Sequence, residues 1–160
     1  MTRKEAREFM MQVYFQMEAC GDFDVNNKTD YMNQDRIDRK QRSYCNDLYS
    51  LLCNKKDQID GRIEAHCTGW KLSRMPKTDL AVLRLAACEI LYLDDILPAV
   101  SINEAVELAK KYGTDASPKY VNAILGKIAE DAEIAEDAVS MAKAEAEEAE
   151  KIDESQEDHA

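Results

Sequence analysis

The chain has 160 residues, of which 45% are hydrophobic and 33% are charged, and its formal net charge is −11 at pH 7. This length suits one domain with a substantial core. No apolar run approaches the roughly eighteen residues that a membrane span needs, and the N-terminus lacks the apolar core of a signal peptide, so we expect a cytoplasmic protein.

The acidity is confined to the C-terminal end of the chain. Residues 130–160 hold 13 of the 32 acidic residues and two of the 21 basic ones, which leaves 19 of each in residues 1–129. Because the remainder is neutral, the net charge does not exclude a nucleic-acid partner. We predict a domain over residues 1–131 and an acidic Ala/Glu-rich tail over residues 132–160, disordered or transiently helical.

Helical periodicity accounts for most of the domain. Thr2 and Glu5 form a capping box, and apolar residues then recur at helical spacing until Gly21. Further helices are expected over residues 36–53, 56–67, 80–93, 101–113 and 117–128. Since no strand pattern is found, the sequence predicts an all-α fold.

Cap signals set the expected starts of the later helices. Thr78 precedes an apolar segment that we place at the centre of the fold, and Ser101 with Glu104 reads as a second capping box. Gly113 ends that helix, and Ser117 followed by a proline begins the last one. Arg84 lies inside the central helix, so it must either reach the surface or pair, with Glu89 or an acid from a neighbouring helix as its partner.

Met11 and Phe15 fall on a different face of the first helix from its apolar stripe. The periodicity therefore predicts that both are exposed. Large apolar side chains on the surface favour a protein partner. The alternative is that another helix of this chain covers them.

Basic residues gather at the start of the first helix, where Arg3 and Arg7 are one turn apart and Lys4 is beside them. Cations at a helix N-terminus oppose its macrodipole, so a phosphate partner is one explanation for the cluster. The other is a solvated helix end.

Lys119 and Tyr120 follow the start of the last helix. Free backbone N–H groups at such a start bind phosphate, and an aromatic ring beside them stacks on an unpaired base. The alternative is that Tyr120 belongs to the core.

Residues for catalysis are scarce. The five cysteines form no CxxC pair, the chain has two histidines, and no Gly-rich phosphate loop, GxSxG or HExxH motif occurs. Glu104 and Glu107 are one turn apart but lack the histidine of a di-metal set. We expect no catalytic residue, metal site or cofactor.

Three segments carry a specific family resemblance. They are residues 79–86 (DLAVLRLA) followed by Glu89, residues 98–113 (PAVSINEAVELAKKYG) and residues 117–122 (SPKYVN). Together with the basic opening over residues 3–8, they make residues 1–130 resemble the NusB family of bacterial transcription antitermination factors. The stretch over residues 70–128 carries most of the likeness.

The resemblance implies an all-helical fold of two small bundles and a non-enzymatic role. Family members pair with the ribosomal small-subunit protein NusE, bind boxA-type single-stranded RNA in nascent transcripts, chiefly of ribosomal RNA operons, and act on the RNA polymerase elongation complex. By position, Arg3, Lys4 and Arg7 match the basic RNA-binding segment. Lys119 and Tyr120 match a Lys-Phe pair at the RNA face. Phe15 and Asp79 match positions that face NusE, and Met11 shares the surface predicted for Phe15.

Two other functions stay open. NusB-like domains accompany the catalytic domain of some RNA methyltransferases, but too few residues follow residue 128 for a methyl-donor domain in this chain. A protein-only interaction scaffold would use Phe15 and Asp79 and leave the cations solvated. A homodimer is also possible, because a second copy would cover the same Met11 and Phe15 surface.

Overall fold

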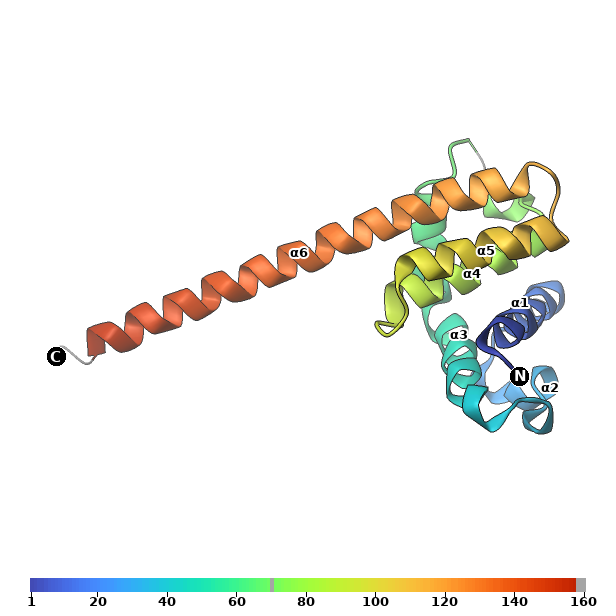
Figure 1. Ribbon diagram of the computed structural model, residues 1–160, viewed down its shortest axis with the longest axis horizontal. Coiled ribbons are helices and arrows are strands. Elements are labelled where there is room, and N and C mark those ends of the chain that lie inside the picture. The colour runs from blue at the N-terminus through green and yellow to red at the C-terminus, as the bar shows by residue number, and fades with distance from the viewer. Residues whose placement is uncertain (70, 158–160) are drawn as a thin grey trace. The chain divides into compact units, whose positions relative to one another are not determined.

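The computed structural model describes residues 1–69 and 71–157, with side chains as far as Lys151. The regular elements in these residues are all helices, which confirms the all-α class (Figure 1). The α-helices are α1 (Arg3–Cys20), α2 (Lys28–Tyr31), α3 (Arg42–Glu64), α4 (Lys77–Tyr92), α5 (Pro98–Tyr112) and α6 (Ser117–Glu157). The end of the predicted tail, residues 158–160, and Trp70 lie outside the described residues.

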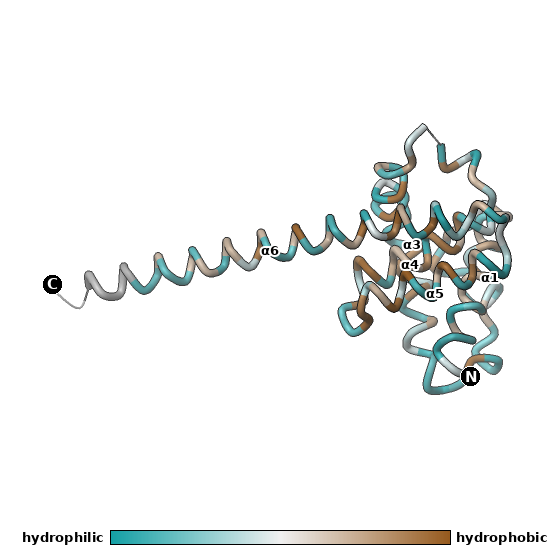
Figure 2. Tube along the Cα trace, turned by 45° about the horizontal axis from the view of Figure 1, so that its top comes forward, coloured by the Kyte–Doolittle hydropathy of each residue, from teal (hydrophilic) through white to brown (hydrophobic). Residues whose placement is uncertain are grey.

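The compact unit over Met1–Ala129 is organised around α4. Every residue from Asp79 to Glu89 is buried, because α1, α3 and α5 all pack against this helix. One bundle contains α1, α2 and the start of α3, and the other contains α4, α5 and the first turns of α6 (Figure 1). Hydrophobic and hydrophilic residues are both present along most of these helices, as expected of amphipathic helices (Figure 2).

The ends of α1 follow the sequence signals. The Thr2 hydroxyl accepts the N–H of Glu5 at 3.1 Å, and the Glu5 carboxylate accepts the N–H of Thr2 at 3.2 Å. Gly21 ends the helix with a left-handed backbone at φ 62°, a conformation that glycine adopts without a steric cost. The predicted capping box and stop are confirmed.

Two predicted helix starts are wrong. α5 begins earlier, at Pro98, because proline is well suited to the first position of a helix. Ser101 therefore lies inside α5, where its hydroxyl donates to Glu89 at 2.9 Å. α4 begins at Lys77 directly after Pro76, so Thr78 is not its cap.

The two helices predicted over residues 36–53 and 56–67 are joined. They form α3, which starts at Arg42 and is interrupted only at Lys55, where φ is −123° and ψ is 15°. The segment from Gln34 to Gln41 forms two short 3₁₀ turns instead. The periodic pattern located the apolar residues but did not show that a single irregular residue connects them.

An ion pair lies in the middle of the first unit. The Arg7 guanidinium donates to both oxygens of Glu89, with Nε at 2.9 Å from Oε2 and Nη2 at 3.1 Å from Oε1. Glu89 also accepts the hydroxyls of Tyr44 at 2.6 Å and of Ser101 at 2.9 Å. One buried carboxylate thus connects α1, α3, α4 and α5.

Arg84 pairs with acids of neighbouring helices, one of the alternatives expected. Its Nε lies 2.8 Å from Asp60 of α3, and its Nη1 lies 2.7 Å from Glu18 of α1. Glu89, the other predicted partner, is committed to Arg7. This second charged cluster ties α4 to the same two helices at another point.

The second unit begins at Glu130 and continues α6 as helix to Glu157. Among its described side chains, Ile134, Val139 and Met141 are each more than half exposed. A membrane-spanning helix is absent from the described residues of the whole chain.

We predict that Glu89→Gln lowers the free energy of unfolding by about 3–5 kcal/mol, because it leaves the Arg7 guanidinium buried without a counter-charge. Urea unfolding at pH 7 followed by circular dichroism measures the change. The matched control is Glu107→Gln, which breaks the exposed pair with Lys110. Exposed pairs of this kind contribute little, so the control should unfold as the parent does. Equal losses in both variants would contradict the assignment.

Candidate nucleic-acid interface

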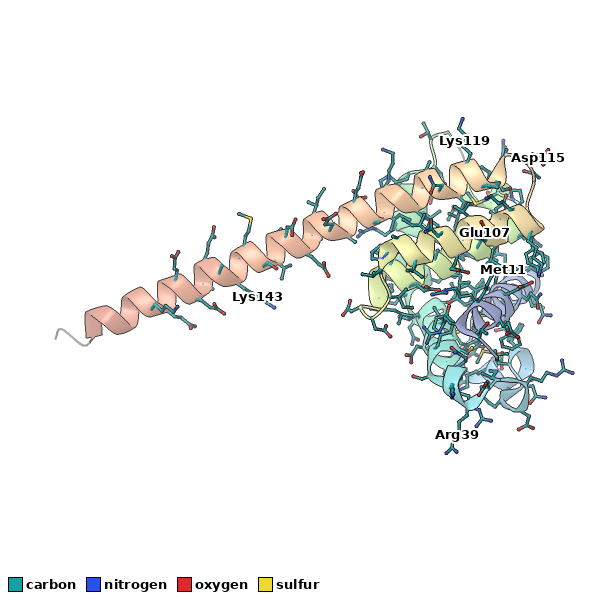
Figure 3. All side chains as sticks on the ribbon, in the orientation of Figure 1. Met11, Arg39, Glu107, Asp115, Lys119 and Lys143 are labelled. Carbon is teal, nitrogen blue, oxygen red and sulfur yellow. The ribbon has the colours of Figure 1, made fainter. Side chains whose placement is uncertain are left out.

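The first turn of α6 presents Lys119 and Tyr120 side by side. α6 starts at Ser117, as the Ser-Pro signal predicted. Lys119 is exposed, and its side chain projects from this turn (Figure 3). Tyr120 is half-buried. The cation is thus on the surface and the ring is partly covered within the same helical turn.

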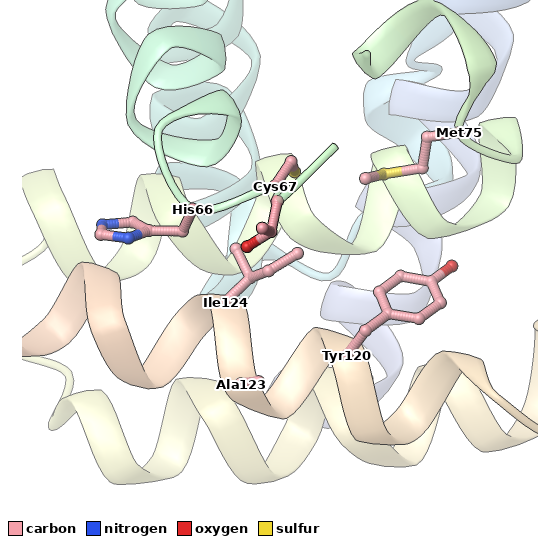
Figure 4. Close-up of a pocket in the computed structure, with 7 residues that line it drawn as sticks. His66, Cys67, Met75, Tyr120, Ala123 and Ile124 are labelled. Atoms are coloured by element: carbon pink, nitrogen blue, oxygen red, sulfur yellow. The ribbon is translucent and has the colours of Figure 1, made fainter. Parts of the chain in front are cut away.

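Tyr120 borders a pocket next to α6 (Figure 4). Its walls come from α6, from the segment that follows α3 and from the segment before α4. The lining residues are His66, Cys67, Thr68, Met75, Tyr120, Ala123 and Ile124. Tyr120 is thus neither a core residue nor a free surface ring. One side of it packs on the domain, and its hydroxyl donates to Asp79.

Arg3 and Lys4 lie at the start of α1. The Arg3 side chain donates from Nε to Gln41 at 2.8 Å, and its guanidinium lies 4.1 Å from the centre of the Tyr44 ring. These contacts hold Arg3 in one orientation while it stays partly exposed. Lys4 is exposed and lines a groove between α1 and α5.

The groove adds two lysines that sequence reasoning missed, Lys110 and Lys111. Both stand in the last turn of α5, and the Lys-Lys pair before Gly113 was the available signal. Three glutamates line the same groove, so its charges cancel. Lys111 donates to Glu8 at 2.6 Å, and this hydrogen bond lowers the pKa of Glu8. The groove is therefore a weaker phosphate site than its lysines suggest.

Arg7 does not join these cations at the surface. It is 6% exposed, and its guanidinium faces Glu89 inside the domain. The spacing of charges had placed it with Arg3 and Lys4. The structure separates Arg7 from them because its guanidinium pairs with Glu89. The local charge pattern could not show this pairing, since Glu89 is 82 residues away in the sequence.

The predicted exposure of Met11 is wrong, whereas that of Phe15 is confirmed. Met11 is 1% exposed and Phe15 is 38% exposed. The buried residues of α1 run from Ala6 to Met17 and cover about 160° of the helix, wider than the apolar stripe alone. Met11 lies at the edge of this buried arc, and Phe15 lies beyond it. A partner would meet Phe15 first.

Asp79 is also buried, at 1% exposure. Its Oδ2 accepts the hydroxyl of Ser117 at 3.0 Å and the hydroxyl of Tyr120. Burial raises the pKa of this carboxyl, and the hydrogen bond from Ser117 opposes the shift. Asp79 is therefore placed beneath the start of α6 and offers almost no surface to a partner.

The part of the chain that the structure describes contains no group of three or more His, Cys, Asp or Glu side chains arranged to hold a metal ion. The surface instead combines exposed cations, a half-exposed ring and one exposed phenylalanine.

Comparison with known proteins identifies the family of the chain. The sequence model of the NusB family matches residues 4–130. The transcription antitermination protein NusB of Alkaliphilus oremlandii is 44% identical over 130 residues, which cover 81% of this chain and 94% of that protein. NusB of Acetivibrio thermocellus is 41% identical over 128 residues, or 80% of this chain and 88% of that protein.

Solved structures agree with the fold. The T. maritima NusB structure superposes with a TM-score of 0.74 at 33% identity and covers 81% of this chain and 92% of that one. A structure of the antitermination factors NusB and NusE with double-stranded RNA has a TM-score of 0.70 at 24% identity, covers 81% of this chain and 96% of that one, and supports the fold alone. On the family match and the identity to its relatives, this chain is a member of the NusB family.

Proposed function

We propose that this chain is a transcription antitermination factor which, together with NusE, binds boxA-type single-stranded RNA in nascent transcripts and promotes processive elongation by RNA polymerase. The observation that carries the proposal is the family match over residues 4–130, with relatives above 40% identity that are transcription antitermination proteins. A structural neighbour has been solved as a NusB complex with NusE and double-stranded RNA, which makes NusE and RNA the partners to test. A factor acting on nascent bacterial transcripts works in the cytoplasm.

The RNA face in this proposal has two parts. Lys119 and Tyr120 supply a phosphate contact and a stacking ring at the start of α6, where backbone N–H groups also favour an anion. Arg3 and Lys4 supply two further cations at the start of α1. Arg7 is buried beneath these two cations, and its pair with Glu89 anchors the start of α1.

The protein partner in this proposal contacts α1 through Phe15. The Phe15 ring is 38% exposed, so part of its apolar surface contacts water. A partner that covers this surface gains the free energy of burying it. Met11 lies one turn before Phe15 and is buried, so it offers the partner no surface of its own. The proposed role is binding rather than catalysis, because the relatives are transcription antitermination proteins.

RNA binding is tested with a fluorescent boxA RNA and a scrambled control, with and without NusE. We expect NusE to tighten binding to boxA but not to the scrambled RNA. Tyr120→Ala should weaken boxA binding by about 1–3 kcal/mol through lost stacking, and Lys119→Ala should weaken binding to both RNAs. If NusE binds and no RNA does, the chain is a protein-only scaffold.

Salt dependence tests the number of phosphate contacts. With Arg7 paired internally, three cations remain, and each contributes about −0.7 to the slope of log affinity against log salt for a single strand. We expect a slope of about −2 between 50 and 300 mM KCl, measured by fluorescence anisotropy on the NusE complex. A slope near zero would remove Arg3, Lys4 and Lys119 from the RNA face.

NusE binding tests the protein face. Phe15→Ala should weaken NusE binding at least tenfold, because a partly exposed aromatic anchor is the kind of residue that dominates an interface. Isothermal titration calorimetry without RNA provides the measurement. Gln16→Ala, the next exposed position on α1, is the control. Light scattering of the free protein shows whether a homodimer covers Phe15 instead, in which case Phe15→Ala produces monomers and leaves NusE binding unchanged.

A further inference from the structure

A buried carboxylate lies directly beneath the proposed RNA contact at the start of α6. Asp79 belongs to the first turn of α4 and is 1% exposed. Its Oδ2 accepts two hydroxyls from α6, those of Ser117 and Tyr120, which are one helical turn apart. A single oxygen atom therefore fixes both the first residue of α6 and the ring that is proposed to stack on RNA.

Ser117 extends the same network into the loop before α6. Its Oγ lies 2.9 Å from the N–H of Thr114, which donates to it, and its side chain is fully buried. A Cβ at Gly113 would lie 2.6 Å from this Oγ, so the end of α5 and the start of α6 approach as closely as glycine allows. The loop between α5 and α6 is thus fixed at both of its ends.

This arrangement lowers the stability of the fold. The second oxygen of Asp79, Oδ1, is buried and accepts no hydrogen bond, and burying a carboxylate without full hydrogen bonding is unfavourable. Burial accordingly raises the pKa of this group. An apolar side chain at residue 79 would avoid this cost, so packing alone does not account for an aspartate there.

The Tyr120 hydroxyl explains what the aspartate achieves. A Phe ring at this position would be held by packing alone, and the family resemblance places Phe there in many members. A tyrosine whose hydroxyl is bonded to Asp79 has both side-chain torsions restrained before RNA arrives. Restraint of this kind lowers the entropy lost on binding.

We propose that Asp79 is a positioning residue for RNA recognition, which acts by holding the phenol of Tyr120 and the hydroxyl of Ser117 so that the ring and Lys119 are presented in one fixed orientation. This inference rests on the proposed RNA-binding function. It gives Asp79 a role from within the domain, where its side chain is 1% exposed, beside the NusE-facing position that the family resemblance implies.

The test is a double-mutant cycle on boxA affinity in the NusE complex. Tyr120→Phe keeps the ring and removes only the hydroxyl, and we expect about fivefold weaker binding from lost preorganisation. Asp79→Ala should weaken binding to a similar extent. The double variant should bind no worse than either single one, because both changes break the same contact.

A rescue variant and a second cycle separate positioning from a general structural role. Asp79→Asn keeps an oxygen that accepts both hydroxyls, so it should recover most of the affinity that Asp79→Ala loses. The same cycle is measured on the free energy of unfolding. Among the parent, the two single variants and the double variant, boxA affinity should depend on whether the hydroxyl contact is present. A merely structural role would instead make boxA affinity follow the free energy of unfolding.

Tyr31→Phe is the matched control. Tyr31, the last residue of α2, donates its hydroxyl at 3.0 Å to Asp22, which lies in the loop after α1. This variant removes the same kind of contact away from the start of α6, so its boxA affinity should equal that of the parent.

Three outcomes would overturn the inference. They are parental affinity in Tyr120→Phe, multiplicative losses in the double variant, and a loss in Asp79→Ala that affects NusE binding alone. Failure of the proposed function is distinguishable, because the parent complex would then bind boxA RNA no more tightly than the scrambled control. If Tyr120→Ala weakens binding and Tyr120→Phe does not, the RNA face stands and the positioning role of Asp79 falls.

Discussion

The Arg7–Glu89 ion pair is the interaction on which the rest of the first unit depends. Glu89 lies on the central helix α4 and receives a guanidinium from α1 and hydroxyls from α3 and α5. Apolar packing is tolerant of small rotations, whereas a bidentate charged contact is directional. The pair therefore fixes how α1 is rotated on α4, and that rotation decides that Phe15, rather than Met11, faces outward.

The same constraint links the two parts of the proposed RNA face. Arg7 and Arg3 are one turn apart on α1, and both guanidinium groups lie near the Tyr44 ring, at 6.0 Å and 4.1 Å from its centre. The buried pair thus helps to determine where the partly exposed Arg3 is held. A charge inside the core can serve RNA binding without touching RNA.

Local signals predicted the fold well, and long-range contacts limited the prediction of the site. The capping box at Thr2, the stop at Gly21 and the start at Ser117 depend on neighbours within a few residues, so sequence alone located them. Ser101 misled for the opposite reason, since its partner Glu89 lies across the bundle. The burial of Arg7, Met11 and Asp79 likewise depends on helices that the periodicity of one segment cannot reveal.

The close approach at Gly113 has a consequence for how the protein tolerates mutation. Every other amino acid carries a Cβ, which would lie 2.6 Å from the Ser117 hydroxyl and 2.8 Å from the Ala109 carbonyl oxygen. Any single-base change that replaces this glycine therefore displaces Ser117, and with it the contacts beneath Tyr120. A substitution at Gly113, which lies outside the proposed RNA face, would therefore alter that face.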